Sequence, residues 1–471
     1  MKNKKYLIMK YTLLFAFCLG FQSKLVSQEL NGWDFFVLNP DLKTDALVVF
    51  QNNQVVYEKY NHQFDSKTKH MVWSISKSLT STVLGAMAYQ NKFSSKQFRQ
   101  INVTEISSKI DKKYSYITLD HFLSWSSGIQ WNESYENNSS DPTQSSVAQL
   151  LYGDGVENSF EFIWQLPIQK PANSVFSNWN YSTGDSHMAL QLGQLIQKNI
   201  ISHEKSIPSE IAQKYLFQQL EINDVTLLKD STGYLAGGSG FYMTAYDLLK
   251  IGKLYLNNGK YNDHVILGTD WIQDSFKNPP LFQENQNLFQ PLKSWWTLST
   301  DAKQKHQLPD MILAIGHWDQ YLIIIPSLNA VIVRFGLNQK SSFPILNFLK
   351  KANQLLNPNT KLAFSLPKKD FVNLKTNEST NLNVPAFKSN IFTLGKRYRA
   401  LHMCQCLFVM KQSKSYCEEL SQVNPPVFKI AKITENSVTA ELIGKVPGSS
   451  EVDLMAVTAT FLNNQYGCEF N

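Results

Sequence analysis

The sequence predicts an α+β protein in which an antiparallel sheet is flanked by helices and an all-helical lobe is inserted, followed by a small, mostly β C-terminal domain. Two β-type patterns stand far apart in the chain, and a long region of helices and loops separates them. The composition then changes after Leu356. Since one core rarely organises more than ~250–300 residues, we expect the two β ends to form one sheet and the helical middle a separate lobe.

The β patterns are distinct enough to place strands. Residues 46–50 and 54–59 are rich in Val, Leu and Tyr and flank a polar turn that contains Asn, which is typical of a hairpin. Residues 320–326 and 330–336 form a second pair of apolar runs about a short turn. A helical pattern at 343–356 follows them and closes the predicted sheet domain.

These patterns divide the chain into three segments. We expect residues 1–27 to be a signal peptide, residues 28–358 to form the sheet-and-helix domain, and residues 359–471 to form the small C-terminal domain. A polar connector rich in Asn, Thr, Pro and Lys begins this last segment, and short β-type runs follow it at 427–430, 437–443 and 455–461.

The first 27 residues have the order of a secretory signal, with lysines and no acidic residue before an apolar run at 11–21. This run is about half of the ~20 residues that a membrane-spanning helix needs. We therefore expect an exported protein, periplasmic or secreted, with no transmembrane anchor after leader removal. Two alternatives stay open: a lipid anchor at Cys18, which the bulky Phe17 disfavours, and a buried N-terminal helix, which the unpaired basic cluster disfavours.

The net charge of +7 belongs mostly to this leader, because its five lysines account for all but +2 of the balance. No other stripe of Lys and Arg interleaved with aromatic residues is present. The sequence therefore predicts no nucleic-acid partner.

The four cysteines outside the leader all lie near the C-terminus, at Cys404, Cys406, Cys417 and Cys468. A clustered, even set in an exported protein indicates disulfides. Zinc binding that includes His402 is the alternative, but Cys-x-x-Cys spacing is absent. Because a Cys-x-Cys pair does not readily bridge itself, we expect the first two cysteines to reach outward, one to Cys417 and the other to Cys468.

The strongest chemical signal is a serine and a lysine at the start of an apolar-faced helix. Apolar residues recur every four positions from Ile75 to Met87, so Ser74 stands at the N-terminal end and Lys77 lies one turn later on the same side. A buried amine beside a serine hydroxyl accepts its proton and activates it for attack. The spacing Ser-x-x-Lys alone is weak, since it occurs four times in the chain, and the alternative for Ser74 is a simple helix cap.

The sequence resembles the penicillin-recognising serine hydrolases, in particular the class C β-lactamase-like branch that also contains esterases, D-amino-acid peptidases and 6-aminohexanoate-oligomer hydrolases. The resemblance spans roughly residues 40–358 and implies a β-lactamase/transpeptidase-like fold. Five landmarks carry it, in the order of the family: Trp73-Ser-Ile-Ser-Lys77, Ile117 to Gly128, Trp179-Asn-Tyr181-Ser-Thr183, Gly237-Gly-Ser-Gly240 and Gly316-His-Trp-Asp-Gln320.

The resemblance implies a role for each matching residue and no metal or cofactor. Ser74 would be acylated and Lys77 would be its proton partner. Tyr181 would pass a proton to the leaving group, which requires a nearby cation to lower its pKa. The oxyanion hole would consist of the backbone N–H groups of Ser74 and Gln320.

Two departures from the family pattern bear on the substrate. The usual Tyr-x-Asn ends here in Thr183, and the usual Lys-Thr-Gly or His-x-Gly strand motif is His317-Trp318-Asp319. A neutral imidazole, a bulky aromatic wall and a carboxylate do not suit an anionic β-lactam. We therefore expect a small-molecule or peptide-like ester or amide as substrate.

Alternatives remain for several of these residues and for the function. His317 is also compatible with a structural hydrogen-bonded residue, Trp318 with plain packing, and Asp185 and His187 with the first turn of a helix. The alternatives to an esterase or amidase are a penicillin-binding D,D-peptidase or β-lactamase, and a non-catalytic binding protein on the same fold.

Overall fold

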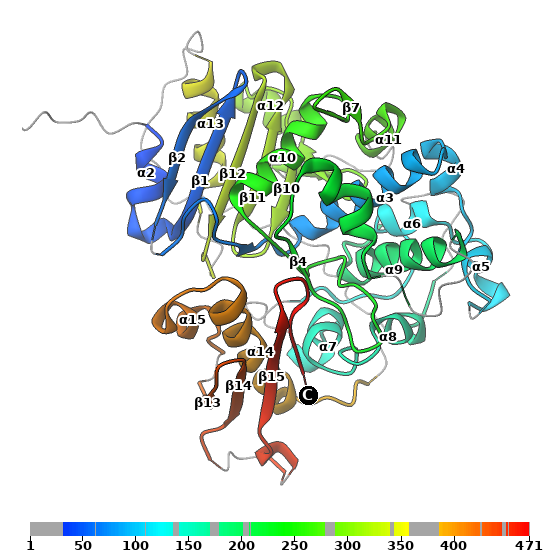
Figure 1. Ribbon diagram of the computed structural model, residues 1–471, viewed down its shortest axis with the longest axis vertical. Coiled ribbons are helices and arrows are strands. Elements are labelled where there is room, and N and C mark those ends of the chain that lie inside the picture. The colour runs from blue at the N-terminus through cyan, green and yellow to red at the C-terminus, as the bar shows by residue number, and fades with distance from the viewer. Residues whose placement is uncertain are drawn as a thin grey trace, which may run out of the picture.

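The computed structural model describes a sheet domain, a helical lobe and a C-terminal module (Figure 1). The predicted signal peptide lies outside the described residues, as does most of the predicted connector. No helix in the described part of the chain is long and apolar enough to cross a membrane. The described residues are 32–470 without 62, 109, 135–140, 170–178, 201–206, 208, 278–287, 340–342, 358–385, 424–425, 445–448 and 451.

The central sheet joins the two ends of the sheet domain, as predicted. The N-terminal hairpin consists of β1 (Thr44–Gln51) and β2 (Gln54–Tyr60), and β1 pairs antiparallel with β12 (Ala330–Gly336). The strand order is β2-β1-β12-β11-β10-β9-β8. The remaining strands of this sheet are β11 (Gln320–Ile325), β10 (Ile312–Gly316), β9 (Trp296–Leu298) and β8 (Phe289–Pro291).

Both faces of this sheet are covered, so its central strands are apolar at nearly every position. Val48 and its same-face neighbours pack toward the helical lobe and α10 (Ala245–Leu256), whereas Val49 and its neighbours pack against α2 (Asp34–Leu38) and α13 (Ile345–Leu356). Figure 1 shows α2 and α13 beyond one side of the strands and the helical lobe on the other.

The helical lobe is built around α3 (Ile75–Gln90), which is buried along almost its whole length. This burial places the first turn of α3 between the sheet and α9 (Thr183–Ile200). Its other α-helices are α4 (Ser95–Arg99), α5 (Val103–Ile106), α6 (Leu119–Leu123), α7 (Ser146–Tyr152), α8 (Ser159–Gln165) and α11 (Thr269–Ser275). Helix α12 (Thr300–His306) packs instead in the cluster on the other face of the sheet, with α2 and α13. Shorter elements are η1 (Pro40–Leu42), η2 (Lys112–Tyr114), η3 (Pro142–Gln144), η4 (Gln213–Phe217), η5 (Gln218–Leu220), η6 (Pro326–Leu328), β3 (His70–Met71), β4 (Thr226–Leu227), β5 (Phe241–Met243), β6 (Lys260–Tyr261) and β7 (His264–Val265).

The C-terminal module is a four-stranded antiparallel sheet packed on a helix. The three predicted β runs correspond to β13, β14 and β15, and β16, which the sequence analysis does not predict, completes the order β13-β14-β15-β16. The sequence analysis does not predict the helices of this module, of which α14 (Ile391–Cys404) covers the sheet. Its elements are completed by η7 (Gln405–Val409), α15 (Lys414–Leu420), β13 (Phe428–Ile433), β14 (Ser437–Leu442), η8 (Val452–Leu454), β15 (Val457–Asn463) and β16 (Gly467–Phe470).

Two disulfides tie this module together, and both partners of the Cys-x-Cys pair reach outward as predicted. Cys404 is bonded to Cys468 and Cys406 to Cys417. The first links the end of α14 to the last strand, and the second links η7 to α15.

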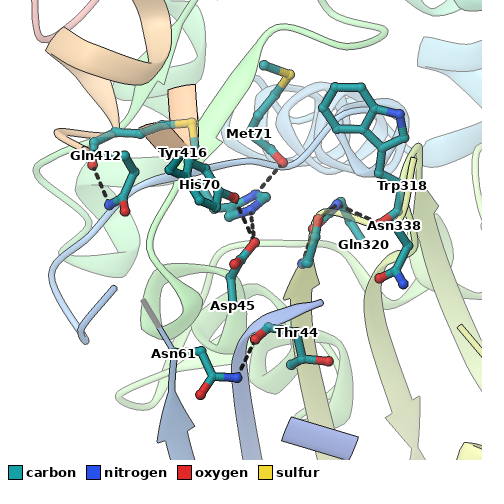
Figure 2. Close-up of polar contacts among 12 residues, drawn as sticks. Thr44, Asp45, Asn61, His70, Met71, Trp318, Gln320, Asn338, Gln412 and Tyr416 are labelled. Atoms are coloured by element: carbon teal, nitrogen blue, oxygen red, sulfur yellow. Dashed lines mark hydrogen bonds and ion pairs between the residues drawn. The ribbon is translucent and has the colours of Figure 1, made fainter. Parts of the chain in front are cut away.

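A buried polar contact joins the module to the first strand of the sheet domain. The Asp45 carboxylate accepts a hydrogen bond from the Tyr416 hydroxyl at 2.8 Å and lies 3.1 Å from His70 Nε2. Figure 2 shows Asp45 beneath His70 and Tyr416, close to the turn that carries Trp318. Because all three side chains are buried, the module and the domain share one core rather than meeting across a solvated linker.

The two disulfides are expected to contribute unequally to stability. A cross-link that closes 64 residues removes more disorder from the unfolded chain than one that closes 11. Replacing Cys404 and Cys468 by Ala should lower the free energy of unfolding by about 4 kcal/mol, and replacing Cys406 and Cys417 by about 3 kcal/mol. Urea denaturation of both variants measures this difference, and an equal or reversed order would contradict it.

Candidate active site

The nucleophile candidate lies where β3 leads into α3. Trp73, directly before it, has φ +49°, in the left-handed region that a side chain of this size rarely adopts. Ser74 follows at the N-terminus of α3 and its side chain makes no capping hydrogen bond. The helix-cap alternative is therefore wrong for Ser74, whose hydroxyl is free for other partners. The residue is 9% exposed.

Lys77 places its amine against that hydroxyl. Its Nζ lies 2.9 Å from Ser74 Oγ, 2.8 Å from Thr183 Oγ1 and 3.0 Å from the Gly238 carbonyl oxygen. The side chain is 1% exposed. Burial of this amine lowers the pKa of Lys77 to about 8, although the nearby Glu133 carboxylate opposes the shift. A substantial fraction of Lys77 is consequently neutral at mildly alkaline pH.

Tyr181 completes the predicted trio. Lys77 Nζ lies 4.8 Å from the centroid of the phenol ring, and the rings of Trp125 and Trp296 pack against it. Burial and the charge of Glu133 raise the pKa of Tyr181 well above its usual value, while a hydrogen bond with Ser74 opposes them. The expectation that a cation lowers this pKa is thus wrong, and the raised pKa favours a protonated, neutral phenol at Tyr181.

Thr183 takes the place that the family motif gives to Asn. Its hydroxyl contacts Lys77 and donates to the Glu133 carboxylate, and its backbone N–H donates to the same carboxylate at 2.9 Å. Trp131 Nε1 also donates to Glu133. The carboxylate, which is buried, lies 4.0 Å from Lys77 Nζ. A threonine at this position therefore binds the lysine and also couples it to an acid.

The turn between β10 and β11 forms the neighbouring wall. Gly316 lies so close to the nucleophile turn that a Cβ there would stand 2.4 Å from the Val72 carbonyl oxygen. His317 and Trp318 both pack edge-on against Trp73, with centroids 5.3 and 5.1 Å apart. His317 is partly exposed, whereas Trp318 is 2% exposed and lies in the same buried cluster as Trp73. The packing alternative is therefore favoured for Trp318, and the predicted aromatic wall is reduced to His317.

The next two residues of this turn face other partners. Asp319 accepts hydrogen bonds from the Tyr321 hydroxyl at 2.9 Å and the Phe343 N–H at 3.2 Å. The Gln320 side-chain amide bonds to the carbonyls of His317 and Trp318 and to both backbone polar groups of Gly336. Gln320 thus braces the turn with its side chain, and its predicted oxyanion role rests on its backbone N–H alone.

Asp185 and His187 lie at the start of α9, which agrees with the alternative that they belong to the first turn of a helix. Both also make hydrogen bonds near the site. Asp185 accepts from the Ser127 hydroxyl at 2.7 Å, and burial raises its pKa to about 7. His187 Nδ1 accepts from the Gly238 N–H at 3.1 Å, and burial lowers its pKa to about 3. A neutral imidazole therefore holds the glycine whose carbonyl contacts Lys77.

The C-terminal module also reaches this site, which the sequence analysis misses. The His402 ring lies 5.4 Å from the Trp73 ring, and its Nε2 is 2.7 Å from the Tyr152 hydroxyl. Glu133 is missed as well. No spacing in the sequence points to either residue, because the contacts that connect His402 to Trp73 and Glu133 to Thr183 join segments that are far apart in the chain.

The comparisons with known proteins agree with this fold. The family model described as Beta-lactamase matches residues 39–342. The chain belongs to the β-lactamase family. It is 23% identical over 234 residues to a 6-aminohexanoate-dimer hydrolase from Paenarthrobacter ureafaciens, and this match covers 49% of the chain and 56% of that relative. The chain therefore matches little more than half the length of this curated relative.

The solved structure of EstCE1 shows the same fold at low sequence identity. EstCE1, a hydrolase with promiscuous acyltransferase activity, superposes with a TM-score of 0.50 at 13% identity, over 67% of this chain and 93% of that one. A penicillin binding protein from Bacillus halodurans gives a TM-score of 0.44 at 12% identity, over 64% and 94%. The matched region is the sheet domain with its helical lobe, in a β-lactamase/transpeptidase-like fold.

The pKa of Lys77 predicts how Ser74 acylation depends on pH. Only the neutral amine accepts the Ser74 proton, and the folded-state pKa is lowered to about 8. The rate of Ser74 labelling by a fluorophosphonate should therefore rise with pH through about 8, and Lys77→Met should abolish this rise. A flat profile, or a midpoint near that of a solvated lysine, would contradict the assignment.

Proposed function

We propose that this protein is an exported serine hydrolase that cleaves a neutral ester or linear amide through a Ser74 acyl-enzyme. The observation that carries the proposal is the contact of Lys77 Nζ with Ser74 Oγ at 2.9 Å in a buried site where the amine is readily deprotonated. A helix N-terminus beside the hydroxyl also favours the negative charge that develops there.

In the acylation step, neutral Lys77 takes the proton from Ser74 as Oγ forms a bond to the substrate carbonyl carbon. The carbonyl π electrons move onto oxygen, where the backbone N–H groups of Ser74 and Gln320 stabilise them. When the intermediate collapses, the bond to the leaving group breaks. Tyr181 donates its proton to the departing alcohol or amine and recovers one from the Lys77 ammonium.

Deacylation uses the same groups with water in place of the serine. Water adds to the acyl carbon while Lys77 accepts its proton, and the Ser74 oxygen leaves as the carboxylic acid is released. The proton held by Lys77 returns to Ser74 and restores the starting site. No cofactor enters this scheme.

The turn after β10 supports a neutral substrate. His317, which is partly exposed, stands where the family's Lys-Thr-Gly motif offers a cation and a hydroxyl to an anionic carboxylate. The buried rings of Trp73 and Trp318 pack against His317, and no lysine stands in this turn to bind a carboxylate. The 6-aminohexanoate-dimer hydrolase named among the relatives is compatible with a linear amide, and the hydrolase and acyltransferase activity named for EstCE1 is compatible with an acyl-enzyme.

Probes of the acyl-enzyme test this proposal. Purified protein is incubated with a fluorophosphonate, with a fluorescent penicillin and with short acyl esters, and adducts are found by mass. We expect phosphonate labelling and ester hydrolysis, and Ser74→Ala should lower the hydrolysis rate by about 10³-fold or more. Labelling by penicillin as well would favour the D,D-peptidase or β-lactamase alternative.

The chain supplies a matched control for this experiment. Ser66 has the same Ser-x-x-Lys spacing, to Lys69, but stands in a loop rather than at a buried helix. Ser66→Ala should keep full labelling. No Ser74-dependent adduct with either probe, together with no ester hydrolysis, would refute the enzyme and favour the non-catalytic binding protein.

A further inference from the structure

Glu133 is a buried acid that the catalytic scheme above does not use. Its carboxylate accepts from three donors: Trp131 Nε1 and the Thr183 N–H both reach Oε2, and the Thr183 hydroxyl reaches Oε1. An ionised carboxylate can only accept hydrogen bonds. Because all three partners are donors, the surroundings of Glu133 suit the ionised form.

This contact fixes the direction of the Thr183 hydroxyl. A hydroxyl has one hydrogen to donate, and here Glu133 receives it. Thr183 Oγ1 therefore presents a lone pair to Lys77 Nζ, 2.8 Å away. The Gly238 carbonyl oxygen, 3.0 Å from the same nitrogen, is also an acceptor only.

The number of hydrogens on Lys77 Nζ decides whether Ser74 Oγ faces an N–H group or the lone pair of the amine. The ammonium form has three hydrogens for three oxygen neighbours. The neutral amine has two hydrogens and one lone pair. Thr183 and Gly238 accept the two hydrogens, so the lone pair is left for Ser74 Oγ at 2.9 Å.

We propose that Glu133 is a positioning residue which, through the Thr183 hydroxyl, directs the lone pair of neutral Lys77 toward Ser74. This inference rests on the proposed function, since it assumes that Lys77 is the base for Ser74. It gives the threonine at the Tyr-x-Asn position a role of its own: a hydroxyl can be turned by a neighbouring acid.

The negative charge of Glu133 has the opposite effect on the reactivity of Lys77 to the hydrogen-bond geometry. An experiment can therefore distinguish the effect of the charge from that of the geometry. The charge alone raises the pKa of Lys77 and so lowers the neutral fraction. The other titratable groups around Lys77 are Tyr181, His187 and Asp185. The first two are uncharged near pH 8, because burial raises the pKa of the phenol and lowers that of the imidazole. Asp185 titrates near pH 7 and lies close enough to Glu133 for their charges to interact.

Glu133→Gln distinguishes the two effects. Trp131 Nε1 and the Thr183 N–H donate at the position of Oε2, so the amide oxygen of the glutamine must occupy that position. The amide NH₂ then takes the position of Oε1, where it faces Thr183 Oγ1 and donates to it. The Thr183 hydrogen then turns toward Lys77 and occupies the lone pair that Ser74 needs. At every pH from 6 to 10, we expect Glu133→Gln to lower kcat for acyl-ester hydrolysis by about 100-fold relative to the wild type. KM should change little. If Glu133 acted on Lys77 through its charge alone, Glu133→Gln would leave kcat equal to that of the wild type or raise it near pH 7.

Removing the hydroxyl supplies the decisive comparison. Thr183→Val has no hydrogen to turn, so adding Glu133→Gln to it should change kcat by less than about threefold. The matched control is Glu105→Gln, the same substitution on an exposed acid. Circular dichroism and thermal melting confirm that each variant is folded. A Glu133→Gln variant as active as the wild type, or equally impaired in both backgrounds, would overturn the inference.

An inactive wild-type protein would instead refute the proposed function, and a second measurement covers that outcome. Neutron diffraction from a perdeuterated crystal locates the Thr183 hydroxyl deuterium without any turnover. Deuterium between Thr183 and Glu133 supports the orientation, and deuterium between Thr183 and Lys77 overturns it.

Discussion

The pairing of β1 with β12 is the constraint on which the rest of the molecule depends. It joins residues near 48 to residues near 333, so everything between them must leave the sheet and return to it. The returning strands extend the sheet to β10, whose last residue, Gly316, lies against the Val72 carbonyl just before the nucleophile. The same pairing that closes the domain therefore brings the end of β10 to Ser74.

Burial sets the protonation states of the site. Lys77, Tyr181 and His187 are all enclosed, and for each of them desolvation disfavours the charged form. The resting site consequently combines an amine that deprotonates readily with a phenol that stays protonated. Glu133 is accommodated as an ion in this enclosed region because three donors surround its oxygens.

Sequence patterns predicted the parts of the molecule that follow local rules. Both strand pairs, the helix after Ser74 and the outward bridging of Cys404 and Cys406 are confirmed, because alternation, periodicity and short-range geometry determine them. Helix α14 was missed, since its Lys396, Arg397 and Arg399 interrupt any apolar face. Glu133 was missed for another reason: its partner Thr183 lies 50 residues away, and only the folded chain brings this carboxylate to the start of α9.

The contact of His402 with Trp73 has a consequence for the order in which the protein is made. Trp73 belongs to the nucleophile turn, which leaves the ribosome early, whereas His402 is two residues from a cysteine bonded to Cys468. The surroundings of the turn are thus complete only after the segment that carries His402 has been synthesised. A nascent chain that already contains Ser74, Lys77 and Tyr181 still lacks this neighbour of its nucleophile turn, so synthesis of the catalytic residues alone does not complete the site.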